Sequence, residues 1–458
     1  MKAAADILFN NSNRAYGLNL IPKSTPDTPV RSLQANKHKV SATSDELDVF
    51  LQANLDIWYI WMQWVDYTVI VRVCMFPIDE FARIARHQRR VGITLGVLWM
   101  LQDDTVIRDE SATGQFYMQP DLSSLYRNGG MTAPAAPSAT VMTFWRSETN
   151  GPFDGCPRTT LQTMANKLQS EYNLNILCGF EIEVIFLKPN KDERTGQTTT
   201  IPQQRPPSPG LPLLQEVHQT LVSMDIFIQQ FHAESAPGQF EFVLPPATPL
   251  AAVDALFATR QVVTAVAERR NLRATLHPRP LPGFADTNFL AGIMAHYPVI
   301  VAFTLPQDAS YDRVCSGRLA GSEWVARGFQ NRETPVRKIG PGHWEFKSVD
   351  GLANPYLAVA ALLAGGYIGL KEDVPLTMQE CTVDASTLTP SQRTTMGITT
   401  PLPKSIAQSL EALENDESLR DMLVHDLISS YLTVKRAESA RLLSMSEEER
   451  RLWHLERY

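Results

Sequence analysis

The sequence of 458 residues predicts an α+β protein in which a small N-terminal domain precedes a larger one. Near the start, a β-branched and apolar run, DYTVIVRVCMF at 66–76, is followed by helical spacing in PIDEFARIARHQRR at 77–90. A segment rich in Pro, Ala and Gly at 128–155 then interrupts the pattern, which is typical of a domain junction. Roughly the last eighty residues show helical spacing, which favours helices there.

The first part of the chain is expected to contain a leader and the small domain. Residues 1–45 are rich in Asn, Ser, Thr, Pro and Lys and have little periodicity, which predicts a disordered leader. The small domain is expected at 46–145, where the strand and helix just named lead into the apolar run VGITLGVLWML at 91–101. The larger domain is then expected at 146–458.

The larger domain is predicted to begin with a helix, because CPRTTLQTMANKLQSEYNL at 156–174 places Pro in the first turn. The strand GFEIEVIFL at 179–187 follows, and the Pro-rich loop at 188–210 is expected to be mobile. The remaining patterns predict, in order, a helix at 211–226, a strand-like stretch at 234–246, a helix at 251–270, a strand at 272–280, a helix at 288–303 and a terminal helix at 446–458.

Composition excludes several classes of protein. A net charge of −7 argues against nucleic-acid binding, because phosphate neutralisation needs an excess of basic residues. The N-terminus resembles neither a secretory signal nor a membrane span, and no apolar run reaches about 18 residues, so we expect no membrane partner. Five scattered cysteines without CxxC spacing argue against a thiolate metal site and favour a reducing, cytoplasmic location: Cys74, Cys156, Cys178, Cys315 and Cys381.

Two acidic residues in GFEIEVIFL share one face of the expected strand. Glu181 and Glu183 are two residues apart, which places them about 7 Å apart on one side of the strand. One interpretation is a half-exposed strand with an acidic outer face. Ile185 and Leu187 continue this face as apolar, however, which indicates that it is covered. Buried carboxylates must be paired or bind a metal ion.

A second pair of acids lies in ESAPGQFEFVLPP at 234–246, where Glu234 and Glu241 flank the pair Pro237-Gly238. On a straight strand, side chains seven residues apart point to opposite faces. The Pro-Gly pair allows a kink, so both carboxylates can converge on one point. The alternative is a loop with two solvated acids.

A third cluster lies at 310–366, where Glu345 is expected on a short strand and Asn354-Pro355 begins a helix. Three arginines in this region are able to bind phosphate or carboxylate groups with two hydrogen bonds each, the alternative being a surface network of ion pairs: Arg313, Arg332 and Arg337. Five glutamates on strand-like segments and three arginines on loops together favour a site with two cations for phosphoryl transfer.

In this order, the motifs GFEIEVIFL, ESAPGQFEFVLPP, SYDRV, NRETPVRKI, HWEFKSVDG and ANPYLAVAALLAGG resemble those of the glutamine synthetase superfamily. The most similar branch is the fungal type I-like, fluG-like branch, and the resemblance covers about residues 60–458. It implies a β-grasp-like N-terminal domain and a catalytic domain with a curved antiparallel sheet and flanking helices, incomplete by one strand segment. It also implies ATP and Mg²⁺ or Mn²⁺ as cofactors, and a homo-oligomeric ring.

The resemblance implies roles for individual residues. Glu183, Glu234 and Glu241 match the ligands of the first divalent cation, and Glu181 and Glu345 match two of the three ligands of the second.

Arg313, Arg332 and Arg337 match the arginines that bind the acid substrate and the transferred phosphoryl group. Asp66 in WVDYT matches an acid that the N-terminal domain offers to the ammonium ion bound by a neighbouring subunit. The implied reaction is phosphorylation of a γ-carboxylate by ATP, followed by attack of ammonia or an amine on the acyl phosphate.

Three departures from the family pattern matter. ATLHPRPLPGFADTNFLAG leads straight into the next helix, so the strand that carries the histidine ligand of the second cation is missing, and neither His277 nor His343 occupies its position. Leu319 replaces a glutamate that helps to deprotonate ammonium. Lys347 replaces a substrate-binding arginine, which keeps the charge but loses the planar fork.

Our leading hypothesis is an ATP-dependent ligase that joins a carboxylate to ammonia or an amine. A second hypothesis is a catalytically impaired relative with a scaffold or regulatory role in fungal development or secondary metabolism. A third is that the missing strand reflects an incorrect gene model, which a transcript with an added histidine-coding segment near residues 280–290 would reveal.

Overall fold

A computed structural model describes residues 44–107, 113–129, 137–191, 198–200, 210–234, 236–275, 281–283, 287–312, 314–316, 323–340 and 342–457. The described residues belong to one compact unit, Ala42–Tyr458. Only the last two residues of the expected leader at 1–45 are described, and they begin helix α3 (Ser44–Ala53). Most of the loop expected at 188–210 lies outside the described residues.

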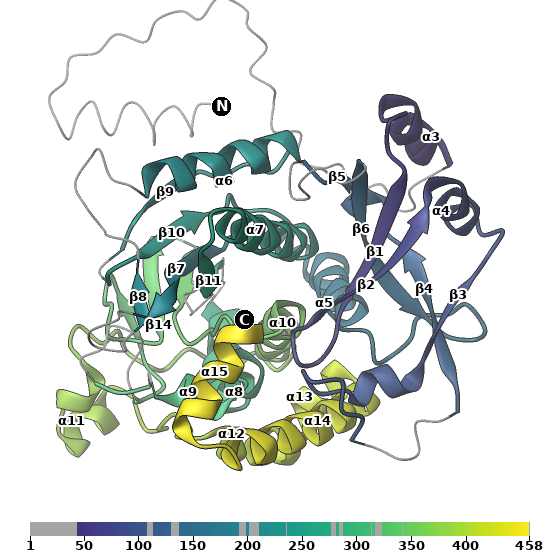
Figure 1. Cartoon of the computed structure of the whole chain (residues 1–458). Helices are drawn as coiled ribbons and strands as arrows, with labels where there is room; N and C mark the ends of the chain where they lie inside the picture. The colour runs from purple at the N-terminus through teal and green to yellow at the C-terminus, as the bar shows by residue number, and fades with distance from the viewer. Residues whose placement is uncertain are drawn as a thin grey trace, which may run out of the picture. The chain divides into compact units, whose positions relative to one another are not determined.

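The N-terminal part forms a sheet with the strand order β2-β1-β6-β4-β3, to which β5 adds by pairing with β6 (Figure 1). Strand β1 is parallel to β6 and antiparallel to β2. Phe116 of β4 and Trp145 of β6 stack in its core with ring centroids 4.6 Å apart. The elements of this part are β1 (Tyr59–Val65), β2 (Val71–Pro77), α4 (Ile78–Ala85), β3 (Val91–Thr94), η2 (Leu95–Trp99), β4 (Gln115–Pro120), η4 (Leu122–Ser124), β5 (Tyr126–Arg127) and β6 (Ser138–Arg146).

The strand predicted at 66–76 is wrong in its first half. Strand β1 ends at Val65, and the chain turns over residues 66–70 before β2 begins. The Asp66 carboxylate causes this turn, because its Oδ1 accepts hydrogen bonds from the backbone N–H of Thr68 at 2.9 Å and of Ile70 at 3.0 Å. Side-chain hydrogen bonding to the local backbone therefore overrides the β propensity of the run.

Two further sheets belong to the larger part of the chain. One has the order β11-β7-β10-β9, with β8 pairing with β7, and the other has the order β12-β15-β14-β13. Their strands are β7 (Glu181–Lys191), β8 (Thr198–Thr200), β9 (Gln230–Ala233), β10 (Gln239–Val243), β11 (Arg273–Thr275), β12 (Leu281–Gly283), β13 (Arg327–Phe329), β14 (Val336–Gly340) and β15 (His343–Phe346). Together with the helices they form the expected α+β fold with a curved sheet.

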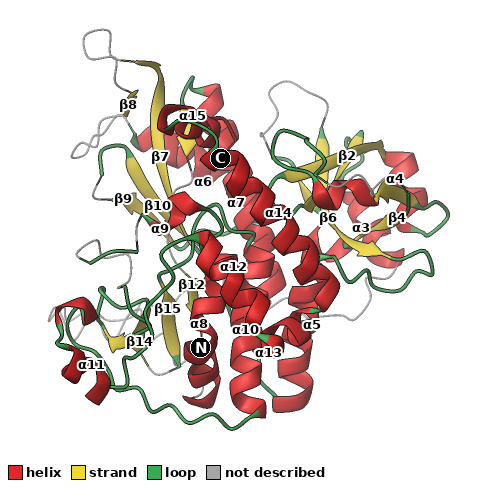
Figure 2. Cartoon of the chain, turned by 90° about the horizontal axis from the view of Figure 1, so that it is seen from below, coloured by secondary structure: helices red, strands yellow, loops and turns green. Residues whose placement is uncertain are grey.

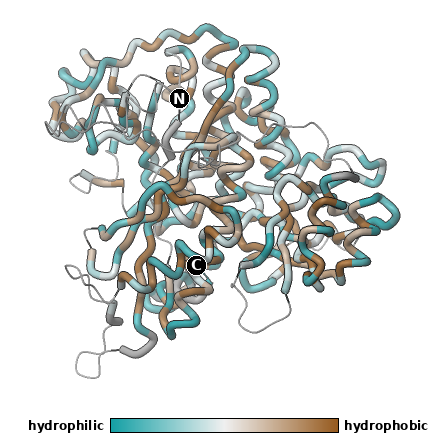
Figure 3. The backbone as a smooth tube through the Cα atoms, turned by 90° about the horizontal axis from the view of Figure 1, so that it is seen from above, coloured by the Kyte–Doolittle hydropathy of each residue, from teal (hydrophilic) through white to brown (hydrophobic). Residues whose placement is uncertain are grey.

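Helices α7, α8 and α10 lie between the N-terminal sheet and these two sheets (Figures 1 and 2). Apolar stretches gather in the interior of the helical layer, whereas the outer helices are more hydrophilic (Figure 3). The helices of this part are α5 (Pro157–Tyr172), α6 (Leu211–Ser223), α7 (Pro249–Arg269), α8 (Thr287–Thr304), α9 (Asp308–Tyr311), α10 (Pro355–Lys371), η5 (Ala385–Thr387), α11 (Pro390–Thr395), α12 (Ile406–Asn415), α13 (Glu417–Leu423), α14 (His425–Leu443) and α15 (Glu447–Arg457).

The long predicted helices are confirmed, with ends shifted by a few residues. Helix α10 begins after Asn354, whose Oδ1 accepts hydrogen bonds from the N–H groups of Tyr356 and Leu357. Helices α7 and α8 are long and apolar enough to cross a membrane, but most of each is buried, and a core helix passes the same test. The domain boundary at residues 145 and 146 stays a prediction.

A short strand forms where the sequence analysis expected none. Strand β12 pairs with β15 and places Pro282 opposite Glu345. The chain therefore does not pass directly from β11 into α8, but the three residues of β12 are Leu, Pro and Gly and include no histidine.

Helices α8 and α10 approach each other so closely that Gly292 has no room for a side chain. A Cβ atom there would lie 2.2 Å from the carbonyl oxygen of Gly365 and 2.5 Å from the Cα atom of Gly369. These contacts involve backbone atoms, which cannot move aside without separating the helices.

We expect the substitution Gly292→Ala to lower the free energy of unfolding by about 1–3 kcal/mol, because it overpacks this contact. A calorimetric scan should show a lower unfolding temperature. Gly340→Ala is the control, because a Cβ atom at Gly340 meets nothing within 4 Å. Equal midpoints for both variants would contradict the prediction.

Candidate metal and phosphate site

Two buried carboxylates face each other across neighbouring strands. Strand β10 is antiparallel to β7 in a register that places Glu241 directly opposite Glu183. Both residues are buried, with 6% and 5% of their surface exposed. Directly opposed side chains have Cβ atoms about 5 Å apart, and like charges in this arrangement repel. A bound cation would remove this repulsion.

The other face of the same strands is a packed apolar layer. Phe240 and Phe242 alternate with Glu241 and are buried, as are Ile182 and Val184 on β7. Helix α7 packs against β7 and β11, which places the apolar side chains in the core. The alternation that the sequence predicted for the Glu181 strand is therefore confirmed.

The stretch at 234–246 forms a hairpin and not a kinked strand. Strand β9 ends at Ala233 and β10 begins at Gln239, and Gly238 between them has a φ of 76°, which glycine adopts without strain. The backbone N–H of Glu234 donates to the carbonyl oxygen of Gln239 at 2.9 Å. The turn reverses the chain, so Glu234 and Glu241 lie on neighbouring segments. The two acids therefore come close together as expected, but a hairpin and not a kink brings this about.

His232 belongs to this cluster, although the sequence analysis did not select it. Strand β9 places His232 directly opposite Glu241. Its Nε2 atom lies 3.1 Å from Glu234 Oε1 and 3.9 Å from Glu241 Oε1. The signal was present in the sequence, because His232 and Glu234 are two residues apart and therefore share a strand face.

Glu183 is held in place by the hairpin as well. Gln239, the first residue of β10, donates from Nε2 to Glu183 Oε2 at 2.5 Å. Glu181 begins β7, lies opposite Val243, and is half-buried. Ile185 is also half-buried, so the acidic face of β7 is less covered than the sequence analysis expected.

Glu345 lies in the other sheet and has two cationic side chains as partners. Arg337 Nη1 donates to Glu345 Oε2 at 2.9 Å, and Lys347 Nζ lies 3.6 Å from Glu345 Oε1. The Lys347 side chain is only 1% exposed. His343 shares the strand face of Glu345, and burial lowers the pKa of its imidazole, an effect that Glu345 opposes.

The residues fit a first cation better than a second one. In the described part of the chain, one group of three His and carboxylate side chains has ligand atoms within 4.8 Å of one another: His232, Glu234 and Glu241. Such oxygen and nitrogen donors suit a divalent cation. Glu345, by contrast, has both carboxylate oxygens next to cationic groups, and the described strand opposite it, β12, includes no histidine.

The arginines expected to bind phosphate differ in their exposure and in their hydrogen-bond partners. Arg332 is exposed on the turn between β13 and β14. Arg337 lies on β14 and donates from Nη2 to Gln330 Oε1 at 2.7 Å as well as to Glu345. Arg313, like the positions Leu319 and His277, lies outside the described residues.

Asp66 is buried in the N-terminal part and is 2% exposed. Its Oδ2 accepts a hydrogen bond from Arg72 Nε at 2.9 Å, and Asn354 at the start of α10 donates to its backbone oxygen at 2.9 Å. Burial raises the pKa of the Asp66 carboxyl, and the Arg72 guanidinium opposes that rise. The structure therefore places Asp66 in an ion pair within its own chain, and its role toward a neighbouring subunit stays a prediction.

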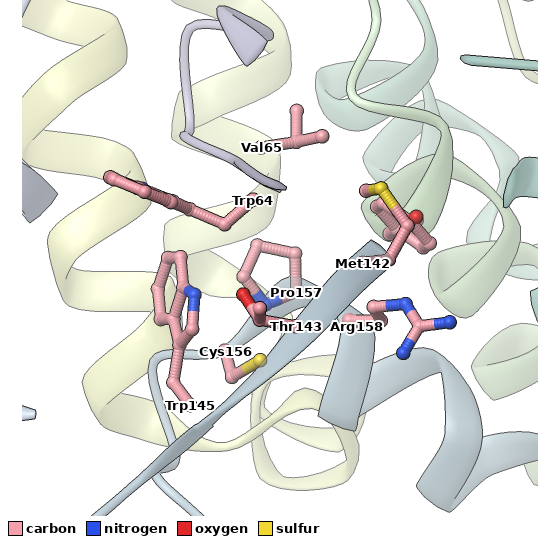
Figure 4. A pocket seen from close by; sticks show the side chains of 9 residues that line it. Trp64, Val65, Met142, Thr143, Trp145, Cys156, Pro157 and Arg158 are labelled. Carbon is pink, nitrogen blue, oxygen red and sulfur yellow. The ribbon is translucent and has the colours of Figure 1, made fainter. Parts of the chain in front are cut away.

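A cavity of about 10 Å³ lies at the end of β1, and its lining includes Val65, the residue before Asp66 (Figure 4). Its lining consists of Trp64, Val65, Met142, Thr143, Trp145, Cys156, Pro157, Arg158 and Tyr356. Arg158 forms ion pairs with Asp121 and Asp254. Although burial favours loss of its proton, these carboxylates keep the pKa of Arg158 above its usual value. Arg158 is thus a charged link between α5, α7 and the end of β4.

Comparison with known proteins identifies the family. The sequence model of the glutamine synthetase catalytic domain matches residues 154–288 and 284–458. The two matches overlap at residues 284–288, next to the point where the sequence predicts a missing histidine-bearing segment. The protein fluG of Emericella nidulans is 52% identical over the whole of this chain, which spans 55% of that protein.

More distant relatives agree in fold. The gamma-glutamylpolyamine synthetase GlnA3 of Streptomyces coelicolor is 26% identical, covering 84% of this chain and 91% of that protein. The structure of a GmaS/ADP complex superposes with a TM-score of 0.73 at 22% identity, covering 90% of this chain and 99% of that one. A glutamine synthetase from Plasmodium falciparum has a TM-score of 0.71 at 16% identity, with the same coverage. The chain belongs to the glutamine synthetase family.

Proposed function

We propose that this protein is an ATP-dependent ligase that joins the carboxylate of an amino acid such as glutamate to ammonia or an amine. The observation that carries the proposal is the register of β7 and β10, which places Glu183 opposite Glu241 with Glu234 beside them. Buried carboxylates in this arrangement need a cation, and phosphoryl transfer needs a cation to neutralise phosphate oxygens. Family membership supports ATP and Mg²⁺ or Mn²⁺ as cofactors.

The residues divide into groups with different tasks. Glu183, Glu234 and Glu241 hold the first cation, which when bound neutralises negative charge on the substrate carboxylate and phosphate. The resemblance assigns Arg332 and Arg313 to binding of the phosphoryl group or the acid substrate, and the exposure of Arg332 is compatible with this role. The terminal phosphoryl group of ATP moves to a carboxylate oxygen, ADP leaves, and the amine then displaces phosphate from the acyl carbon.

Two observations bear on the size of the amine. GlnA3 is named a gamma-glutamylpolyamine synthetase, and Leu319 replaces the glutamate expected near ammonium, so a larger amine is a reasonable candidate. In the proposed homo-oligomeric ring, Asp66 would face a neighbouring amine site only after its ion pair with Arg72 opens. We also propose a cytoplasmic location.

The second candidate function is that of a catalytically impaired relative with a scaffold or regulatory role in fungal development or secondary metabolism. The observation that favours it is Glu345, which has Arg337 and Lys347 as partners and faces Pro282 on β12. Lys347 stands where the family carries an arginine, so the charge beside this carboxylate is kept but the planar guanidinium fork is lost. Phosphate binding on this side of the site would then be weaker.

We expect the purified full chain to release phosphate from ATP in the presence of Mn²⁺, glutamate and one member of a panel of amines that includes ammonia and polyamines. Glu241→Gln should lower this rate at least tenfold, roughly the loss typical when a metal site is weakened, because it removes a charge from the first cation site. A coupled phosphate assay measures both rates.

Glu417→Gln, which changes an exposed glutamate on helix α13, serves as the control and should match the unsubstituted protein. No phosphate release above background with any amine would overturn the ligase proposal. If Mn²⁺ still bound in that case, the impaired relative would be the better account.

A second prediction concerns the charge balance at Glu345. We expect Lys347→Met to lower the free energy of unfolding by about 1–3 kcal/mol, because a buried carboxylate loses one of its two cationic partners. Lys338→Met is the matched control, since Lys338 is 33% exposed and lies 3.7 Å from Glu380, and such an exposed pair contributes about 1 kcal/mol or less.

Thermal unfolding of both variants in metal-free buffer measures the difference. If Lys347→Met were as stable as the unsubstituted protein, the ammonium group would not be holding Glu345. The carboxylate would then be available to a second cation, which would argue against the impaired relative.

A further inference from the structure

The row of side chains across strands β9, β10 and β7 contains one residue that the first cation site has not yet used. His232 lies opposite Glu241, and Glu241 lies opposite Glu183, so all three side chains project from the same face of the sheet. Glu234 follows His232 by two residues, directly after the end of β9, and is the fourth member of the group. The imidazole of His232 therefore lies next to the carboxylates of Glu234 and Glu241.

The distances suit a shared cation. One ligand atom each from His232, Glu234 and Glu241 lies within 4.8 Å of the other two, and the closest pair is 3.1 Å apart. Ligand atoms that each lie about 2.0–2.2 Å from one metal ion are separated by comparable distances. The His232 side chain is 44% exposed, which leaves it room to turn toward a shared ion.

We propose that His232 is a further ligand of the first divalent cation, in addition to the carboxylates of Glu183, Glu234 and Glu241. This inference rests on the proposed function, because it requires that the carboxylates hold a cation. It adds a nitrogen donor to a site whose residues were otherwise expected to offer only oxygen.

The nitrogen donor has a consequence for metal preference. Mg²⁺ prefers hard oxygen ligands and keeps several water molecules, whereas imidazole is a good ligand for transition metals. His232 therefore makes this site prefer Mn²⁺ or Co²⁺ over Mg²⁺. The neighbouring Glu183, held by Gln239, adds negative charge beside the cation.

Mn²⁺ added to the metal-free full chain tests the proposal directly, without turnover. Pulsed electron paramagnetic resonance of bound Mn²⁺ should show hyperfine coupling to a directly bonded imidazole nitrogen. His232→Gln should abolish this coupling and weaken Mn²⁺ binding at least about tenfold, while Mg²⁺ binding, measured by competition, should change much less.

His425→Gln is the matched control, because His425 also contacts a carboxylate, Asp421 at 2.6 Å, but on the exposed surface of helix α14. It should leave both the coupling and the affinity unchanged. Since the nitrogen coupling is measured on the unsubstituted protein, a folding defect in a variant does not affect that result.

Two negative results have different meanings. If Mn²⁺ binds, depends on Glu241, and shows no nitrogen coupling, then His232 is only a hydrogen-bond partner of Glu234, and this inference fails while the proposed function stands. If Mn²⁺ does not bind to the unsubstituted protein at all, the cation site itself is refuted and both proposals fail.

Discussion

Strand β7 pairs with β10 in a register that sets the carboxylate of Glu183 opposite that of Glu241 in a buried position, and the chemistry of the site depends on this pairing. Like charges that lie directly opposite each other on neighbouring strands repel and destabilise the pair. The register is fixed from the other side of the sheet, because a slip by one residue would turn Phe240 and Phe242 out of the core. Apolar packing thus keeps the two carboxylates opposite each other, and a bound cation would reduce their repulsion.

The buried carboxylates of Glu241 and Glu345 have different kinds of neighbours. Around Glu241 the nearest partners are other acids and a histidine, and ligand atoms of His232, Glu234 and Glu241 lie within 4.8 Å of one another. Around Glu345 the partners are Arg337 and Lys347, so the protein supplies its own positive charge. The two carboxylates therefore differ in the charge of their nearest partners.

Spacing within single strands was a reliable guide, whereas the path of the chain between strands was not. The two-residue spacing of Glu181 and Glu183 correctly predicted one acidic and one apolar face, because alternation is a local property of an extended backbone. The turn at Asp66 was missed, since its side-chain hydrogen bonds compete with a strongly β-forming sequence. The sequence predicts a kink where the structure forms a hairpin between β9 and β10. The position of His232 opposite Glu241 follows from this hairpin, and a kinked strand does not predict it.

The sequence by itself determined the α+β class, the long helices, the family and the set of acids from which the site is built. Each of these follows from local periodicity or from the order of short motifs. The tertiary structure decided which of those charges meet: Glu183 with Glu241 and His232, Glu345 with Lys347 and Arg337, and Asp66 with Arg72. Whether a carboxylate binds a cation or an arginine depends on the partners that strand register and burial bring to it, and sequence spacing carries no information about partners on other strands.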